Sequence, residues 1–66
     1  MNTITNTLHA VDIRAIRRSL GDTQRQFAKR LEVRQATVSA WETGHEVPSY
    51  SNTCAIVAIR ESKIRR

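Results

Sequence analysis

Residue types that can read base pairs are concentrated in the segment from Arg34 to Glu42. Gln35 can form paired hydrogen bonds with N6 and N7 of adenine, and Arg34 can do the same with O6 and N7 of guanine. The methyl groups of Ala36 and Ala40 can contact thymine methyls, and their small size lets a helix lie deep in a groove. This pattern indicates a helix whose exposed face reads the major groove of duplex DNA.

Phosphate contacts would have to hold such a helix in register, because backbone contacts position a protein on DNA without reading its sequence. Helix N-termini offer backbone amides and a positive dipole end, which suit phosphate oxygens. Thr23, Gln24 and Thr43 are candidate uncharged residues that donate hydrogen bonds to phosphate. His45, just after the helix predicted to read bases, is a further candidate for a phosphate contact. The complete set of predicted DNA-binding residues is Thr23, Gln24, Arg34, Gln35, Ala36, Thr37, Ser39, Ala40, Thr43 and His45.

The charge of the chain favours an anionic partner. Eleven lysines and arginines oppose six acidic residues, which gives a net charge of +5 and a pI near 10.7. The partner could be nucleic acid, an anionic membrane or an acidic protein, although a small domain commonly carries a net charge of about 2–8 for solubility alone. Arg25, Lys29 and Arg30 lie on different helix faces, so one pose cannot bring all three to DNA.

The 66 residues are enough for one domain of modest stability, since a chain of this length buries only about 60% of the surface it exposes when unfolded. We expect no enzyme activity, no cofactor and no metal site. His9 and His45 lack metal-ligand spacing, and Glu32, Glu42 and Glu46 do not form a credible acid–base pair.

Cys54 is the single cysteine, so the chain can form neither an internal disulfide nor a cysteine-rich zinc site. It precedes the apolar run 55–59, and we interpret it as a small core residue. No apolar run approaches the roughly 20 residues of a membrane span, and no signal peptide is visible. We therefore expect a cytoplasmic protein that is associated with the nucleoid when bound to DNA.

Hydrophobic spacing and capping residues predict four helices, over about 12–20, 23–31, 35–43 and 52–62. The first has Asp12 as its N-cap and Gly21 where a left-handed C-cap belongs. The second begins with a capping box formed by Thr23 and Gln26. Gly44 ends the third. With no convincing strand pattern, the chain is predicted to be all-α.

The apolar positions of these helices define one predicted core, made of Ile13, Ile16, Leu20, Phe27, Ala28, Leu31, Val33, Val38 and Trp41. After the loop around Pro48, Ser51 or Asn52 can cap the fourth helix. Residues 1–11 are predicted to form an N-terminal arm, residues 12–62 the domain, and residues 63–66 a frayed basic tail.

Helix 52–62 has more apolar residues than one buried stripe requires. Cys54, Ala55 and Ala58 could face the core and leave Ile56 and Ile59 partly exposed, or the two faces could be reversed. Either assignment leaves a surplus apolar strip that favours self-association. Ile56 and Ile59 are the candidate dimer interface, and Ile4 and Leu8 of the arm are candidate additions.

One long pattern combines these caps, apolar positions and polar positions: Thr23-Gln24-x-x-Phe27-Ala28-Lys29-x-Leu31-x-Val33-x-Gln35-x-Thr37-Val38-Ser39-x-Trp41-Glu42-x-Gly44-x-x-x-Pro48. This pattern resembles the Cro/C1-type (XRE-like) helix-turn-helix family of phage repressors and bacterial regulators. The resemblance extends over about residues 13–60. It implies a small lambda-repressor-like bundle of four to five helices that binds operator DNA, usually as a dimer.

The resemblance also implies roles for individual residues. Gln24 would hold a phosphate and brace Gln35, which would read a base. Arg34, Ala36 and Ala40 would contact bases or the sugar-phosphate backbone.

The resemblance also concerns one ion pair and one residue of the turn. Arg17 and Glu42 would form a structural ion pair. Apart from the resemblance, Arg14, Arg18, Arg25 and Arg60 are interpreted as solvated. Glu32 departs from the family pattern, which usually has glycine in the turn. A non-glycine residue at positive φ is uncommon, so we expect a reshaped or mildly strained turn.

Together these observations predict a sequence-specific transcriptional regulator. It would be a repressor that binds a pseudo-palindromic operator as a homodimer, with helix 35–43 in the major groove. The alternative is an antitoxin-like interaction module that binds a protein partner and also regulates its own promoter. RNA binding is disfavoured by the lack of exposed aromatic residues, and a membrane-surface peptide by the need of the apolar faces for a core.

Overall fold

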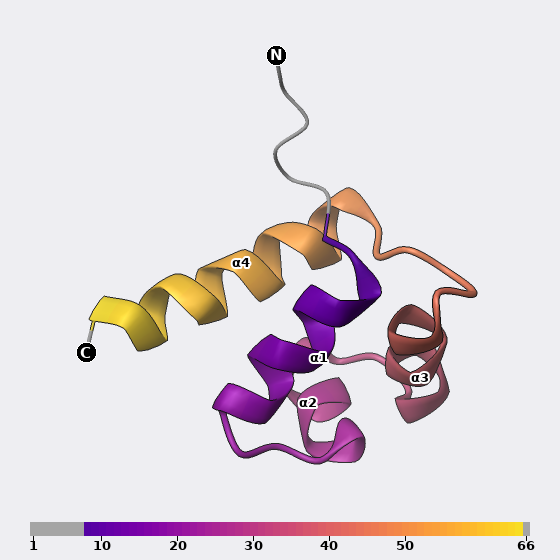
Figure 1. The fold of residues 1–66 in the computed structure, drawn as a ribbon, viewed down its shortest axis with the longest axis horizontal. Coiled ribbons are helices and arrows are strands. Elements are labelled where there is room, and N and C mark those ends of the chain that lie inside the picture. Colours follow the sequence, from indigo (N-terminus) through magenta and orange to yellow (C-terminus); the bar gives the residue numbers. More distant parts are fainter. Residues whose placement is uncertain (1–7, 66) are drawn as a thin grey trace.

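The computed structural model describes residues 8–65, and the side chains of residues 8–62, as four helices joined by short connections (Figure 1). These are α1 (Ala10–Ser19), α2 (Gln24–Leu31), α3 (Gln35–Thr43) and α4 (Tyr50–Arg65). α3 packs against both α1 and α2, while α4 contacts α2. No strand occurs in this part of the chain, and the predicted all-α class is confirmed.

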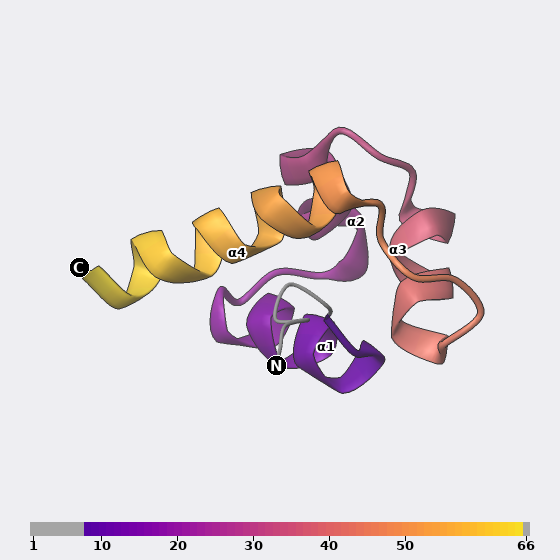
Figure 2. The same ribbon diagram turned by 90° about the horizontal axis from the view of Figure 1, so that it is seen from above.

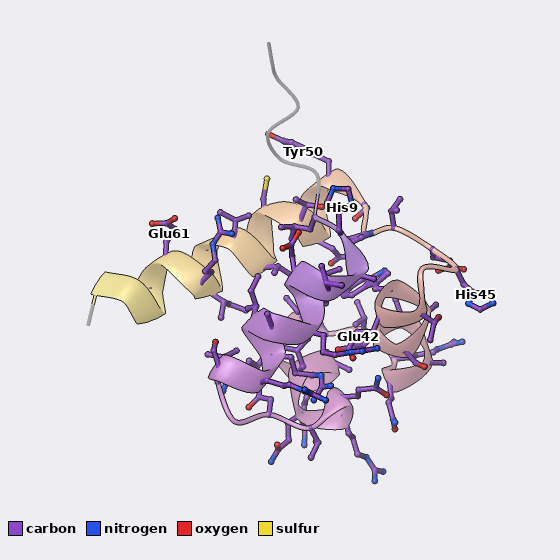
Figure 3. The ribbon with its side chains drawn as sticks, in the orientation of Figure 1. His9, Glu42, His45, Tyr50 and Glu61 are labelled. Atoms are coloured by element: carbon purple, nitrogen blue, oxygen red, sulfur yellow. The ribbon has the colours of Figure 1, made fainter. Side chains whose placement is uncertain are left out.

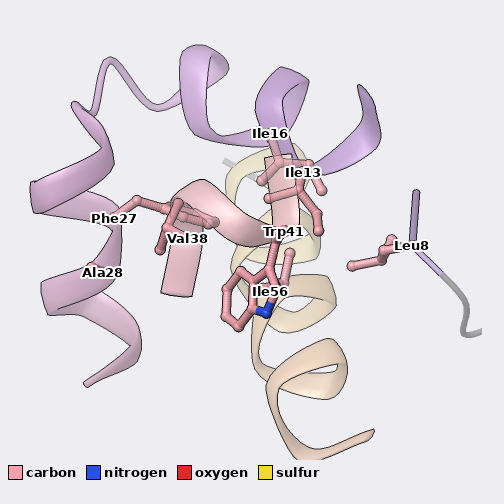
Figure 4. Close-up of a cluster of buried hydrophobic side chains, with 8 residues drawn as sticks. All are labelled: Leu8, Ile13, Ile16, Phe27, Ala28, Val38, Trp41 and Ile56. Atoms are coloured by element: carbon pink, nitrogen blue, oxygen red, sulfur yellow. The ribbon is translucent and has the colours of Figure 1, made fainter. Parts of the chain in front are cut away.

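One buried cluster holds the helices together (Figure 4). Its members are Leu8, Ile13, Ile16, Phe27, Ala28, Val38, Trp41 and Ile56. Phe27 and Val38 are completely buried and Trp41 is 2% exposed, so each removes its full apolar surface from water. Burial of one such side chain contributes roughly 1.5–3 kcal/mol. The predicted inward faces of α2 and α3 are therefore confirmed.

α1 begins earlier than its sequence indicated. His9 is the N-cap residue, with extended backbone, and Asp12 lies in the first turn. The Asp12 carboxylate accepts a hydrogen bond from the His9 backbone amide at 3.1 Å, so Asp12 caps the helix from inside rather than as the N-cap. Ala10 and Val11, assigned to the predicted arm, belong to α1. Residues 1–7 of that arm, with Ile4, lie outside the described residues.

α4 is longer at both ends than expected. The Ser49 hydroxyl accepts a hydrogen bond from the Asn52 amide at 3.1 Å, so Ser49 caps the helix instead of Ser51 or Asn52. At the other end the helix continues through residues 63–65, which were predicted to fray. Figures 1 and 2 both show its C-terminal half extending beyond the other three helices.

α4 also presents the opposite face to the core from the one first considered. Thr53 is 5% exposed and Ile56 is completely buried, whereas Cys54 and Ala58 are exposed. The interpretation of Cys54 as a core residue was therefore wrong, and Ile56 cannot contribute to a dimer surface. Ile59 is partly buried. Burying Ile56 in place of Cys54 or Ala58 removes more apolar area from water, which favours this face.

The first three helices end with the same backbone motif. Each is followed by a residue in the left-handed conformation: Gly21 with φ 75°, Glu32 with φ 59° and Gly44 with φ 83°. After α2, the Val33 amide donates to the Ala28 carbonyl at 3.0 Å and the Glu32 amide donates to the Lys29 carbonyl at 3.2 Å. This is a Schellman motif, which satisfies carbonyls at the helix end. Of the two expectations for Glu32, a reshaped or a mildly strained turn, the structure shows the second, because the residue keeps the left-handed backbone.

Replacement of Glu32 by glycine is expected to stabilise the fold by about 0.5–1 kcal/mol. The left-handed conformation costs an L-residue roughly 1–2 kcal/mol, which glycine avoids. Part of this stabilisation is offset, because glycine raises the entropy of the unfolded chain. Urea denaturation measures the difference. Glu32→Ala is the control, since it removes the carboxylate but keeps the Cβ. Equal stability of the glycine and alanine variants would contradict backbone strain as the cause.

Candidate nucleic-acid interface

The N-terminal end of α3 carries three consecutive exposed candidate residues. Arg34 is the N-cap, with extended backbone at φ −82° and ψ 153°, and its side chain is exposed. Gln35 and Ala36 are exposed as well. Since Val38 and Trp41 bury the inner face of the helix, these residues point away from the core. The structure thus brings a guanidinium, an amide and a methyl group together on one open surface.

The remaining candidates on α3 are either partly buried or already hydrogen-bonded within the protein. Thr37, Ser39 and Ala40 are partly buried. Thr43 is exposed, but its hydroxyl lies 3.0 Å from the Ser39 carbonyl oxygen and 2.8 Å from Nδ1 of His45. A hydroxyl has one hydrogen, so Thr43 can donate to a phosphate only by giving up a bond within this end of the helix. Figure 3 shows His45 projecting from the loop after α3.

The two candidates at the start of α2 differ in how free their hydrogen-bond donors are to bind phosphate. The Thr23 hydroxyl accepts from the Gln26 amide at 3.1 Å, and the Gln26 side chain accepts from the Thr23 amide at 2.8 Å. This predicted capping box leaves the hydroxyl hydrogen of Thr23 available to an acceptor. Gln24 instead donates from Nε2 to Oε1 of Glu42 at 3.2 Å. Among the described residues Gln24 makes no hydrogen bond to Gln35, so the implied bracing of Gln35 is not seen.

Glu42 joins the three helices that build this surface (Figure 3). Its side chain is 1% exposed. Arg17 from α1 binds it with two nitrogens, Nε at 2.6 Å from Oε2 and Nη2 at 3.0 Å from Oε1. Gln24 from α2 supplies a third donor. The expected Arg17–Glu42 pair is present, and because it spans helices it holds α3 at one angle to α1 and α2.

Electrostatics reinforce this arrangement. Burial by itself would raise the pKa of Glu42, but the hydrogen bonds from Arg17 and Gln24 outweigh it and hold that pKa below its ordinary value. The same hydrogen bond raises the pKa of Arg17, against a smaller opposing effect of desolvation. Glu42 therefore remains a carboxylate at neutral pH, and Arg17 stays charged.

Two interactions were missed in the sequence. Arg14, interpreted as solvated, donates from Nη2 to the Glu42 carbonyl at 3.3 Å and lies 3.5 Å from its carboxylate. The i, i+3 spacing of Arg14 and Arg17 places both on one helix face and was the available signal. Arg30 forms a hydrogen-bonded ion pair with Asp22, and the hydrogen bond from Arg30 lowers the pKa of Asp22. Nothing in their spacing pointed to this second pair.

The arrangement defines a class of protein. Two helices, α2 and α3, are joined by a tight turn, and the second has a buried inner face and an outer face of short polar side chains. This is the geometry of a helix-turn-helix, in which the second helix is the one that enters the major groove.

In the described part of the chain, no helix is long and apolar enough to cross a membrane, and no group of metal-binding side chains is found.

Comparison with known proteins agrees with the geometry. A model of the Helix-turn-helix family matches residues 13–57, more than half of the chain. The protein belongs to the Cro/C1-type helix-turn-helix family, whose members are DNA-binding transcriptional regulators. No curated protein and no solved structure matches it.

Proposed function

We propose that this protein is a repressor that binds a pseudo-palindromic operator as a homodimer, with α3 in the major groove. One observation carries the proposal. Arg34, Gln35 and Ala36 are exposed side by side at the N-terminus of α3, whose opposite face is buried through Val38 and Trp41. Recognition helices contact base edges with their N-terminal residues. This end of α3 has the side chains to do so.

Each exposed residue has a distinct task in the proposal. Gln35 pairs with N6 and N7 of an adenine, and Arg34 binds either guanine or a phosphate. Ala36 contacts a thymine methyl. Thr23 and the second amide hydrogen of Gln24 bind phosphate at the start of α2, where the helix N-terminus adds a positive dipole end. The Glu42 network supports this readout indirectly, because it sets the angle of α3.

The homodimer follows from the size of the module. One α3 reaches only the few base pairs of a single half-site. A two-fold dimer would set two copies about 34 Å apart, one turn of the duplex, and would make the operator pseudo-palindromic. Occupation of such a site would exclude RNA polymerase from an overlapping promoter.

Selection from a random duplex library tests the proposal. The expected result is a pseudo-palindromic consensus that binds two chains, as counted by analytical ultracentrifugation of the complex. With that duplex, Gln35→Ala should lose roughly 1–3 kcal/mol of discrimination between the consensus and a duplex changed at the paired adenine. Glu46→Ala, an exposed substitution outside the α3 N-terminus, is the control.

Three outcomes would contradict the proposal. Failure of a consensus to emerge would reject sequence-specific binding. A complex with one chain per duplex would reject the homodimer. Retention of full discrimination by Gln35→Ala would reject its role as base reader, while the Arg34→Ala variant separates base contact from phosphate contact by its salt dependence.

A further inference from the structure

An open pocket of about 620 Å³ lies between α2, the turn that follows it and the start of α3. It is lined by Arg25, Gln26, Ala28, Lys29, Val33, Arg34 and Gln35. The expectation that Arg25, Lys29 and Arg30 lie on different helix faces was wrong for the first two: they are four residues apart on α2, which places them on one face of the helix. Val33 belongs to the turn, and the last two residues open α3. The pocket therefore adjoins the proposed base-reading surface and shares Arg34 and Gln35 with it.

The lining of this pocket carries three positive charges and no carboxylate. Other arginines nearby are already paired: Arg14 and Arg17 with Glu42, and Arg30 with Asp22. Within residues 8–62, by contrast, no ion pair or side-chain hydrogen bond engages the three cations of the pocket. These ion pairs offset most of the positive charge of the three paired arginines, whereas the three charges of the pocket have no such compensation.

We propose that this pocket binds one backbone phosphate of the operator duplex, next to the base pairs that α3 reads. The inference rests on the proposed function. A phosphate has acceptor oxygens for both Arg25 and Lys29, and guanidinium and ammonium groups bind phosphate strongly. Because Arg34 lines both surfaces, an anion held here would belong to the same duplex as the bases. The contact would add affinity and fix register without reading sequence.

The experiment compares the double variant R25Q/K29Q with the charge-matched control R18Q/R60Q. Arg18 and Arg60 lie on α1 and α4 and do not line the pocket. Affinity for the selected duplex and for a random duplex is measured from 50 to 200 mM salt. Loss of one phosphate contact from each chain removes two contacts from the proposed dimer and reduces the slope of log K against log salt by about 1.8, so the wild type should lose about 12-fold more affinity over this range than R25Q/K29Q.

Affinity of R25Q/K29Q for both duplexes should fall by the same factor, and the control should keep the wild-type slope. An unchanged slope in R25Q/K29Q would overturn the proposal that the pocket binds phosphate, and would leave the proposed function intact. This result is expected if the pocket binds an acidic protein partner instead. Unequal losses on the two duplexes would also overturn it, since they indicate base readout. A wild type that binds both duplexes equally contradicts the proposed operator recognition instead, and one that binds neither overturns both. Circular dichroism confirms that each variant is folded.

Discussion

Glu42→Ala is expected to lower the free energy of unfolding by about 3 kcal/mol. Removing one partner of a buried ion pair costs roughly 3–5 kcal/mol, because the other charge is left without compensation. Arg17 is 14% exposed and keeps a hydrogen bond of 2.9 Å to the Asp22 carbonyl, which favours the lower end of this range. Gln24 loses its acceptor as well. Urea denaturation at neutral pH measures the effect.

The control for this prediction is Glu46→Ala, which removes an exposed carboxylate and should change stability by no more than about 0.5 kcal/mol. Acid provides a second check. Since the pKa of Glu42 is lowered in the folded state, its stabilisation is present above its unfolded pKa, about 4.3, and is lost as pH falls through the folded value. The difference in free energy of unfolding between wild type and Glu42→Gln should become smaller below about pH 4. A constant gap from pH 7 to pH 3 would contradict the ionic role of Glu42.

The region from α2 to α3 was the most predictable part of the fold. Local signals there agree with one another: a capping box at Thr23 and Gln26, apolar residues at helical spacing, and Gly44 as the terminator. α3 has the predicted bounds. Consistency among propensity, caps and apolar pattern is what makes a segment specify its structure. The resemblance added the Arg17–Glu42 pair, which joins residues far apart in the chain.

Side-chain partners inside the site were less predictable than the helices. Gln24 was expected beside Gln35, yet its amide binds Glu42. A buried carboxylate needs several donors to stay ionised, and Gln24 is within reach of it once α2 and α3 are packed. Helix starts were missed for a related reason. Asp12 can cap as the first residue or from within the first turn, and spacing alone does not separate these options.

Ile56→Ala should lower the free energy of unfolding by about 3 kcal/mol, whereas Ile59→Ala should cost clearly less. Sequence periodicity could not distinguish the two faces of α4, because apolar residues occupy most of its circumference from residue 54 to 59. The structure makes Ile56 completely buried, in the cluster with Trp41 (Figure 4), and leaves Ile59 only partly buried.

Removing buried methyl and methylene groups costs their transfer free energy together with the cavity that they leave, typically 2–5 kcal/mol for isoleucine to alanine. Denaturation of both variants in urea, at matched protein concentration, measures the difference. A larger loss for Ile59→Ala would restore the first assignment, in which Ile56 is the exposed residue. A loss for Ile59→Ala that shrinks on dilution would show instead that Ile59 supports the proposed homodimer, because dimerisation stabilises the wild type less as the protomer concentration falls.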